Sequence, residues 1–289
     1  MEQLGKLLIQ MIISGVMMGF VFSLIAMGLT IIWGVMNIIN FAHGEFLMIG
    51  MFFSFFFFKY VSIDPLFSLP MVAVLLFIIG FITYHLLIKK VLQGPVLAQL
   101  VVTFGLSIFL VNLAVFLWSA DYRMIENPIA SGKISLAGIA VSIPELVASI
   151  GSMIIGAAVY WFIKRTKTGM AIQAISMDKD AAAIMGINTD RLNAVSFAVG
   201  VMCVGVAGAL LSNFYYVFPE VGSFFGVIAF ATVALGGFGS IEGAMIAGVI
   251  VGLAEIVGGF LLAPAYKYAI VFAIYLAVVL IKPTGLKGW

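Results

Sequence analysis

A histidine and a glutamate two positions apart interrupt one of the most apolar stretches of the sequence. His43 and Glu45 lie in NIINFAHGEFLMIG, residues 37–50, inside an apolar run that extends over residues 7–58. An imidazole beside a carboxylate is a combination that serves proton transfer and metal binding. Asn37 and Asn40 stand in the same stretch. This polar group either performs chemistry or supports the backbone.

The rest of the sequence offers little for catalysis. It holds two histidines and one cysteine, Cys203, which are too few ligands for a typical zinc site, and nothing favours a haem between His43 and His85. No HExxH and no G-x-x-x-x-G-K-[ST] occurs, so the sequence has neither a metalloprotease motif nor an ATP-binding P-loop. We therefore expect a chain that is not an enzyme and uses no metal and no cofactor.

Composition indicates the class of protein. Of 289 residues, 64% are hydrophobic and 9% are charged, whereas about 25% are charged in soluble domains. The apolar runs are continuous instead of alternating, which favours membrane helices over a barrel. We predict an all-α integral membrane protein, a polytopic helical bundle of 8–10 transmembrane helices with broken or re-entrant helices, as a single domain over residues 1–289.

Charged loops separate the apolar runs and orient them. Basic residues favour the cytoplasm, so the pair at 89–90 and the loop at about 164–191 mark the inner side, and the balanced loop at about 119–142 faces outward. The outer loop carries Asp121, Arg123, Glu126 and Lys133, which can contact something delivered from outside. The runs cover residues 7–33, 34–58, 66–88, 97–118, 143–163, 192–218, 224–262 and 265–281.

The two ends of the chain conflict with a simple count of these runs. Eight single crossings place both termini outside, whereas Lys6, Lys282 and Lys287 favour the inside. Three short crossings within residues 7–58 and three within residues 219–282 would remove the conflict and give ten spans.

Small residues predict close helix packing. Gly15, Gly19 and Ser23 form one row at four-residue spacing, and a second row runs from Ala244 through Gly248 to Gly252. Such rows let membrane helices approach closely.

A second break is expected in ALGGFGSIEGAMIAG, residues 234–248. Its glycines at 236, 237 and 239 are too dense for a good helix. Broken helices at membrane depth are buried in protein or line a wet cavity. Glu242 follows this break as Glu45 follows the first, and both carboxylates are functional candidates. Glu255 stays unassigned.

The inner loop contains a short helix. DAAAIMG, from Asp180 to Gly186, has an acidic first turn and a terminating glycine. Its small residues would let it lie in a partner's groove, with Lys179 and Arg191 fixing the register. The alternative is a loop helix without a partner.

The motifs together resemble one family. Asp180-Ala181-Ala182 with Gly186 resembles the E-A-A-x-x-x-G loop of bacterial ABC importer permeases, with aspartate in place of glutamate. With NFAHGEFLMIG and GGFGSIEGAMIAG, essentially the whole chain resembles the LivH-type permeases of branched-chain amino acid uptake systems. The resemblance implies a permease subunit in the bacterial inner membrane, partnered by a second related permease, two cytoplasmic ATPases and an external solute-binding protein.

The candidate site residues fall into two groups. The loop helix from Met177 to Ile187 would be the coupling helix that docks in an ATPase. We expect the polar residues of the first break to satisfy one another and the freed backbone. The pathway or broken-helix group is Asn37, Asn40, His43, Glu45, Gly237, Gly239, Ser240 and Glu242, and the coupling group is Asp180, Ala181, Ala182, Gly186 and Ile187.

Other functions fit parts of the same pattern. Related permeases carry urea, short amides or other amino acids. A channel or secondary transporter could couple to protons through Glu45 or Glu242. A purely structural membrane scaffold would leave the glycine-rich breaks and the loop helix unexplained.

Overall fold

The computed structural model describes residues 2–136, 138–282 and 284–287. These residues form a helical bundle with one β-hairpin, β1 (Lys133–Leu136) and β2 (Ile139–Ser142). The helices are α1 (Glu2–Met36), α2 (His43–Val61), α3 (Pro65–Thr83), α4 (Lys89–Val91), α5 (Val96–Trp118), α6 (Ile143–Arg165), α7 (Lys167–Met177), α8 (Lys179–Ile184), α9 (Thr189–Leu211), α10 (Val221–Gly236), α11 (Ile241–Leu261) and α12 (Lys267–Ile281). A π-helix η1 (Tyr84–Ile88) joins α3 to α4, and a 3-10 turn η2 (Pro264–Tyr266) precedes α12.

The predicted fold class is confirmed. In the described part of the chain, eight helical segments are long and apolar enough to cross a membrane, and α10 is apolar but shorter. Residues 7–58 form two long helices, α1 and α2, so a third crossing there is wrong. Residues 219–282 do contain three helices, as the ten-span version required.

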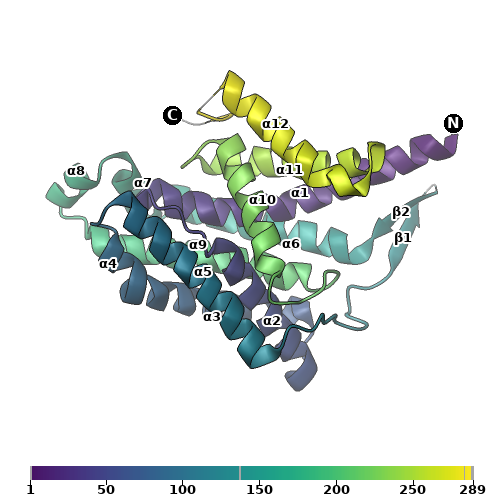
Figure 1. Ribbon diagram of the computed structural model, residues 1–289, viewed down its shortest axis with the longest axis horizontal. Helices are drawn as coiled ribbons and strands as arrows, with labels where there is room; N and C mark the ends of the chain where they lie inside the picture. The colour runs from purple at the N-terminus through teal and green to yellow at the C-terminus, as the bar shows by residue number, and fades with distance from the viewer. Residues whose placement is uncertain (1, 137, 283, 288–289) are drawn as a thin grey trace.

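The two ends of the chain lie at opposite ends of the bundle. Figure 1 shows the first turns of α1 beside the β1–β2 hairpin, whereas Lys287 lies at the start of α11 and lines a cavity together with residues of α7. If the 164–191 loop is cytoplasmic, the carboxyl end is inside and the amino end is outside. The side of the membrane on which each terminus lies stays a prediction, because the eight candidate spans follow from length and composition alone.

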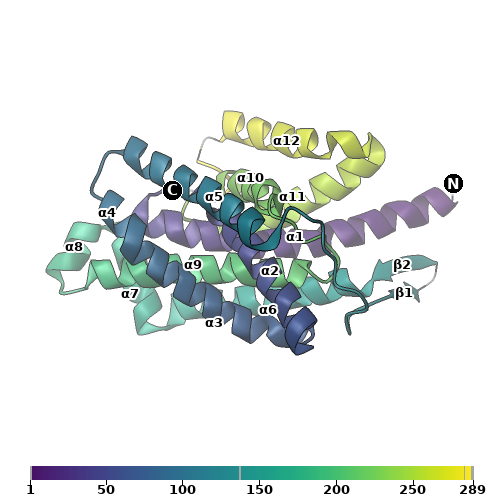
Figure 2. The same ribbon diagram turned by 60° about the horizontal axis from the view of Figure 1, so that its bottom comes forward.

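The centre of the bundle consists of α1 and α9. In their most apolar windows, 83% of α1 and 89% of α9 are buried, against 17% for α5 and 6% for α12. In both views α12 lies along an outer edge of the bundle (Figures 1 and 2). An ion pair contributes to its attachment to α11, since Lys267 Nζ lies 2.8 Å from Oε1 of Glu255, which is 5% exposed. This pair accounts for the previously unassigned Glu255.

The two predicted glycine rows pack against each other. A Cβ on Gly19 would collide with the backbone at Val249, and one on Gly248 would collide with Ser23. Ser23 Oγ also donates to the carbonyl oxygen of Met245 at 2.8 Å. Such close approach increases van der Waals contact between helices in lipid, and it fixes α11 antiparallel along α1.

Candidate functional site

The first break separates α1 from α2 in the bundle. Asn37 follows the end of α1 in a left-handed conformation (φ 51°), and its N–H donates to the carbonyl oxygen of Trp33 at 2.7 Å. Asparagine tolerates this conformation better than most residues. Asn40 then leads into α2, because its Oδ1 accepts from the N–H of Ala42 at 3.2 Å. The two asparagines therefore shape the backbone of the break.

His43 and Glu45 are buried at the start of α2. Their exposed fractions are 0% and 2%. His43 Nε2 lies within hydrogen-bond distance, 3.0 Å, of the carbonyl oxygen of Ile25 in α1. Glu45 Oε1 accepts a hydrogen bond from Ser107 Oγ of α5 at 2.7 Å. A buried carboxylate is costly without such partners, so Ser107 both stabilises Glu45 and joins α5 to α2.

A second hydroxyl of α5 binds the same break. Thr103 Oγ1 donates to the carbonyl oxygen of Ile39 at 2.9 Å. Thr103 and Ser107 are four positions apart and so share one face of the helix. We call these two residues the α5 tether. Because α5 buries little else, the tether is a principal polar attachment of this helix to the bundle.

The polar residues of the break do not satisfy one another as expected. Among the hydrogen bonds of the described residues, none joins two of the side chains of Asn37, Asn40, His43 and Glu45. The physical reason is helical geometry, since each residue turns by about 100° and side chains two positions apart point to opposite sides. His43 therefore faces α1 while Glu45 faces α5.

Glycines bring α2 close to its neighbours. A Cβ on Gly44 would overlap the carbonyl oxygen of Gly222 at the start of α10, and one on Gly50 would overlap that of Gly205 in α9. Glu45 Oε2 lies against Gly222, where any larger side chain would displace the carboxylate. The break, α5 and α10 thus meet around Glu45.

The second break connects α10 to α11. Gly237 and Gly239 have φ of 103° and 80°, values that favour glycine. Ser240 caps α11 by accepting from the N–H of Gly243 at 3.1 Å. Glu242 is not buried in the apolar interior, because its carboxylate is 46% exposed and pairs with Lys287 at 2.9 Å. Tyr160 of α6 also donates to Glu242, at 3.1 Å.

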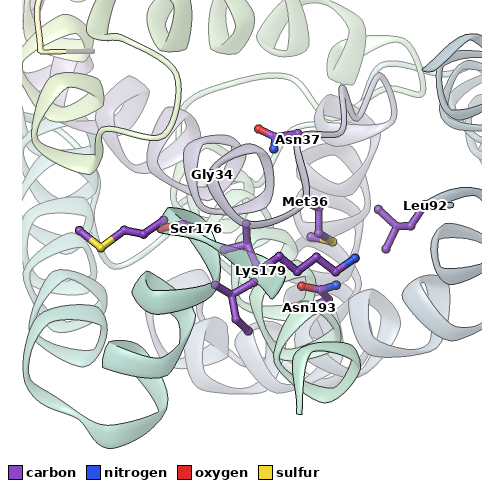
Figure 3. A pocket seen from close by; sticks show the side chains of 10 residues that line it. Gly34, Met36, Asn37, Leu92, Ser176, Lys179 and Asn193 are labelled. Atoms are coloured by element: carbon purple, nitrogen blue, oxygen red, sulfur yellow. The ribbon is translucent and has the colours of Figure 1, made fainter. Parts of the chain in front are cut away.

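A cavity of about 720 Å³ opens beside the second break, and we call it the inner cavity. Its walls come from the ends of α1 and α6, from α7 and from residues 238–242 with Lys287. A chamber of about 170 Å³ shares four of its lining residues, among them Asn37 and Ser176. Figure 3 shows Lys179, from the start of α8, and Asn193, from α9, in this chamber. The cavity and the chamber therefore adjoin the loop predicted to couple to an ATPase.

The short helix of that loop is α8. Asp178 caps it by accepting from the N–H groups of Asp180 and Ala181, both at 2.9 Å. Gly186 ends the segment with φ 83°. Of the predicted coupling residues, Ala182 is buried against the bundle and Asp180, Ala181 and Gly186 are exposed. Ile184 and Met185, which the sequence reasoning did not select, are 86% and 81% exposed. The helix therefore presents apolar side chains away from the bundle.

No constellation for metal binding is found among the described residues, where no three His, Cys, Asp or Glu side chains gather. Cys203 is buried.

Known proteins resemble this chain over nearly its full length. The family model described as branched-chain amino acid transport system / permease component matches residues 11–279. The chain belongs to this permease family. LivH, a permease protein of the high-affinity branched-chain amino acid transport system of Salmonella typhimurium, is 35% identical over 97% of this chain and 95% of its own. The LivH protein of Escherichia coli K12 is 34% identical and BraD of Pseudomonas aeruginosa 30%, with the same coverage. No solved structure matches the chain.

Membership of the branched-chain amino acid permease family confirms the predicted family and its multi-pass membrane location. The structure adds residues that the sequence reasoning missed. Thr103 and Ser107 contact the first break from a helix that begins more than fifty residues later in the chain. Their spacing of four, inside an otherwise apolar run, was the signal that could have found them.

Proposed function

We propose that this permease carries leucine, isoleucine and valine inward across the plasma membrane as one subunit of an ABC importer. The similarity over 97% of the chain to permeases named for branched-chain amino acid transport carries this proposal. In this role the chain is not catalytic, and separate ATPase subunits supply the energy. A second related permease completes the pore, and an external solute-binding protein delivers the amino acid.

The inner loop supports the assignment of ATPase partners. α8 stands at the edge of the bundle in Figure 1 and exposes Ile184 and Met185. Large exposed apolar side chains on a water-facing loop mark a contact surface. The N-terminal cap at Asp178 and the left-handed Gly186 fix the ends of this short helix. ATPase closure would then move α8, and with it the wall of the pathway.

The first break is the proposed wall of the pathway. It reaches the surface of the bundle at Phe41, 40% exposed, whose ring lies 6.1 Å from that of Phe104 in α5 and 5.5 Å from that of Phe230 in α10. An apolar wall over a polar break suits weak, transient contact with a branched side chain. This wall would be supported from the interior of the bundle by three buried residues, Asn40, His43 and Glu45.

Uptake by reconstituted vesicles tests the function. The chain is purified with its associated subunits, placed in proteoliposomes with ATP inside, and supplied with the associated binding protein and radiolabelled leucine. We expect ATP-dependent uptake that excess isoleucine and valine compete away. Uptake that urea or a short amide blocks instead, or that a proton gradient drives without ATP, would contradict the proposal.

The hydrogen bond between Ser107 of the α5 tether and Glu45 gives a prediction for the proposed wall of the pathway. Glu45→Gln replaces the carboxyl group that accepts from Ser107. Ser107→Ala leaves Glu45 Oε1 without its donor, and a buried acceptor left without a partner costs about 1–3 kcal/mol. We expect both variants to lower uptake and to lower the melting temperature of the purified complex. Asn112→Ala is the matched control, because Asn112 lies on the exposed side of α5 and bonds within its own helix. Full uptake by the Glu45→Gln protein would show that transport does not need the carboxyl group of Glu45.

A further inference from the structure

The inner cavity has the size of a ligand site. Its volume of about 720 Å³ lies within the roughly 300–1,000 Å³ usual for small-molecule pockets. Its lining includes residues of α7, and α7 lies far from the β-hairpin (Figure 1). If the side of α7 is cytoplasmic, the cavity is accessible to solutes that have already been imported.

One wall of the cavity is aromatic. Trp33 at the end of α1 and Phe238 in the second break place their ring centroids 4.6 Å apart. Both residues line the cavity. Their faces offer an apolar surface for an aliphatic side chain.

Another part of the cavity wall is charged. Lys287 and Glu242 form an ion pair at 2.9 Å, and Lys164 also lines the cavity. An ammonium has three donors and a carboxylate about four acceptor positions, so this ion pair leaves both groups able to bind more. A zwitterion would thus meet a cation for its carboxylate and an anion for its ammonium.

The adjoining chamber is lined by a buried amide whose oxygen lacks a hydrogen-bond partner. Asn193 is 4% exposed, and its Oδ1 has no hydrogen bond in the described structure. It lines the chamber together with Lys179 of α8 (Figure 3). Buried polar atoms normally have partners. A donor group of a solute in the chamber could pair with this oxygen.

The position of the cavity connects binding to transport. Gln173 and Ser176 of α7 line it on one side, and the start of α11 on the other. A ligand that contacts both sides stabilises their present arrangement. It therefore opposes any movement of the α7–α8 segment against α11.

We propose that the inner cavity binds a free amino acid with an apolar side chain from the cytoplasm, and that the bound amino acid slows import by restraining α7. The proposal rests on the proposed function, which makes the cytoplasm the side where this amino acid accumulates. Lys164 and Lys287 bind the carboxylate, Glu242 the ammonium, and Trp33 and Phe238 the side chain.

The first experiment measures inhibition from inside. Proteoliposomes holding the assembled importer and ATP are preloaded with unlabelled leucine, with glutamate at the same concentration, or with neither. We expect leucine alone to lower the initial rate of uptake and of ATP hydrolysis by about fivefold or more, a usual size for coupling between two sites. Lys287→Met and Trp33→Leu should remove this inhibition. Lys282→Met is the control, since Lys282 lies on the same terminal segment and bonds the carbonyl oxygen of Leu286 instead.

The second experiment measures occupancy directly. Ser176→Cys places a thiol in the cavity wall, and the native Cys203 is fully buried. We expect leucine to slow maleimide labelling of this thiol in the full complex, and glutamate not to. Adding Lys287→Met should abolish the protection.

The two proposals fail in different ways. Vesicles without preloaded solute that take up no leucine contradict the proposed function. Normal uptake together with unchanged rates after preloading, or with labelling that leucine does not slow, overturns the inner site alone.

Discussion

Gly44→Val is expected to abolish uptake and to prevent stable assembly of the permease. Gly44 lies so close to Gly222 that any Cβ would overlap its carbonyl oxygen. The start of α2 would have to move away from α10, which would separate Glu45 from Ser107. Overpacking of this kind costs typically about 1–3 kcal/mol, and here the obstacle is backbone that cannot rotate away. Thermal unfolding of the purified complex and uptake by proteoliposomes measure the effect.

Gly105→Ala is the matched control for this variant. Gly105 lies in α5, where a side-chain methyl group would meet no atom within 4 Å, and alanine favours a helix over glycine by about 1 kcal/mol. We expect normal or slightly raised stability and normal uptake. A Gly44→Val protein that melts and transports like the control would show that α2 does not need its close approach to α10.

Gly186→Val is expected to reduce uptake about tenfold or more while the protein reaches the membrane in normal amounts. The position has φ 83° and no neighbouring atom within 4 Å, so the change strains the backbone without causing a clash. A left-handed conformation costs an ordinary residue roughly 1–2 kcal/mol, and relief of this strain reshapes the end of α8. We expect ATP hydrolysis to continue while uptake falls, because the docking surface no longer follows ATPase closure.

Gly5→Val serves as the control for the coupling variant. Gly5 lies in α1 beside open space and has no left-handed backbone, so the same substitution should leave uptake unchanged. If the Gly186→Val protein takes up leucine normally and its ATP hydrolysis stays coupled to that uptake, α8 does not have the coupling role.

The breaks and the loop helix were predictable because their signals are local. Glycine density marked the second break, and the acidic first turn, the alanines and the terminating glycine of the inner loop marked α8. The partners of Glu45 and His43 were not predictable, since a hydroxyl on α5 and a carbonyl on α1 reach them only after the helices pack. Hydropathy also misplaced Glu242, which lies in an apolar sequence but at an exposed end of α11. The exposure of Glu242 depends on where α11 begins, and the turn at Gly237 and Gly239 sets that start.

The ends of the chain show the same limit. Charge rules assigned Lys6 and Lys287 to one side, whereas the bundle holds them apart. Lys287 has a specific partner in Glu242, and the first turns of α1 lie beside the β1–β2 hairpin (Figure 1). Such contacts between distant parts of the chain cannot be read from the number of charges near each end.

The carboxyl-terminal segment has a consequence for how the protein is made. The N–H groups of Leu286 and Lys287 donate to the carbonyl oxygens of Leu235 and Gly236 at 2.9 and 3.0 Å, where α10 ends. Those carbonyls cannot gain these partners until α11 and α12 have been synthesised and inserted. During biogenesis, the carbonyl oxygens of Leu235 and Gly236 at the end of α10 therefore lack these two hydrogen-bond partners until the carboxyl-terminal segment is in place. A chaperone, the insertion machinery or water has to cover that end until the last part of the chain emerges from the ribosome.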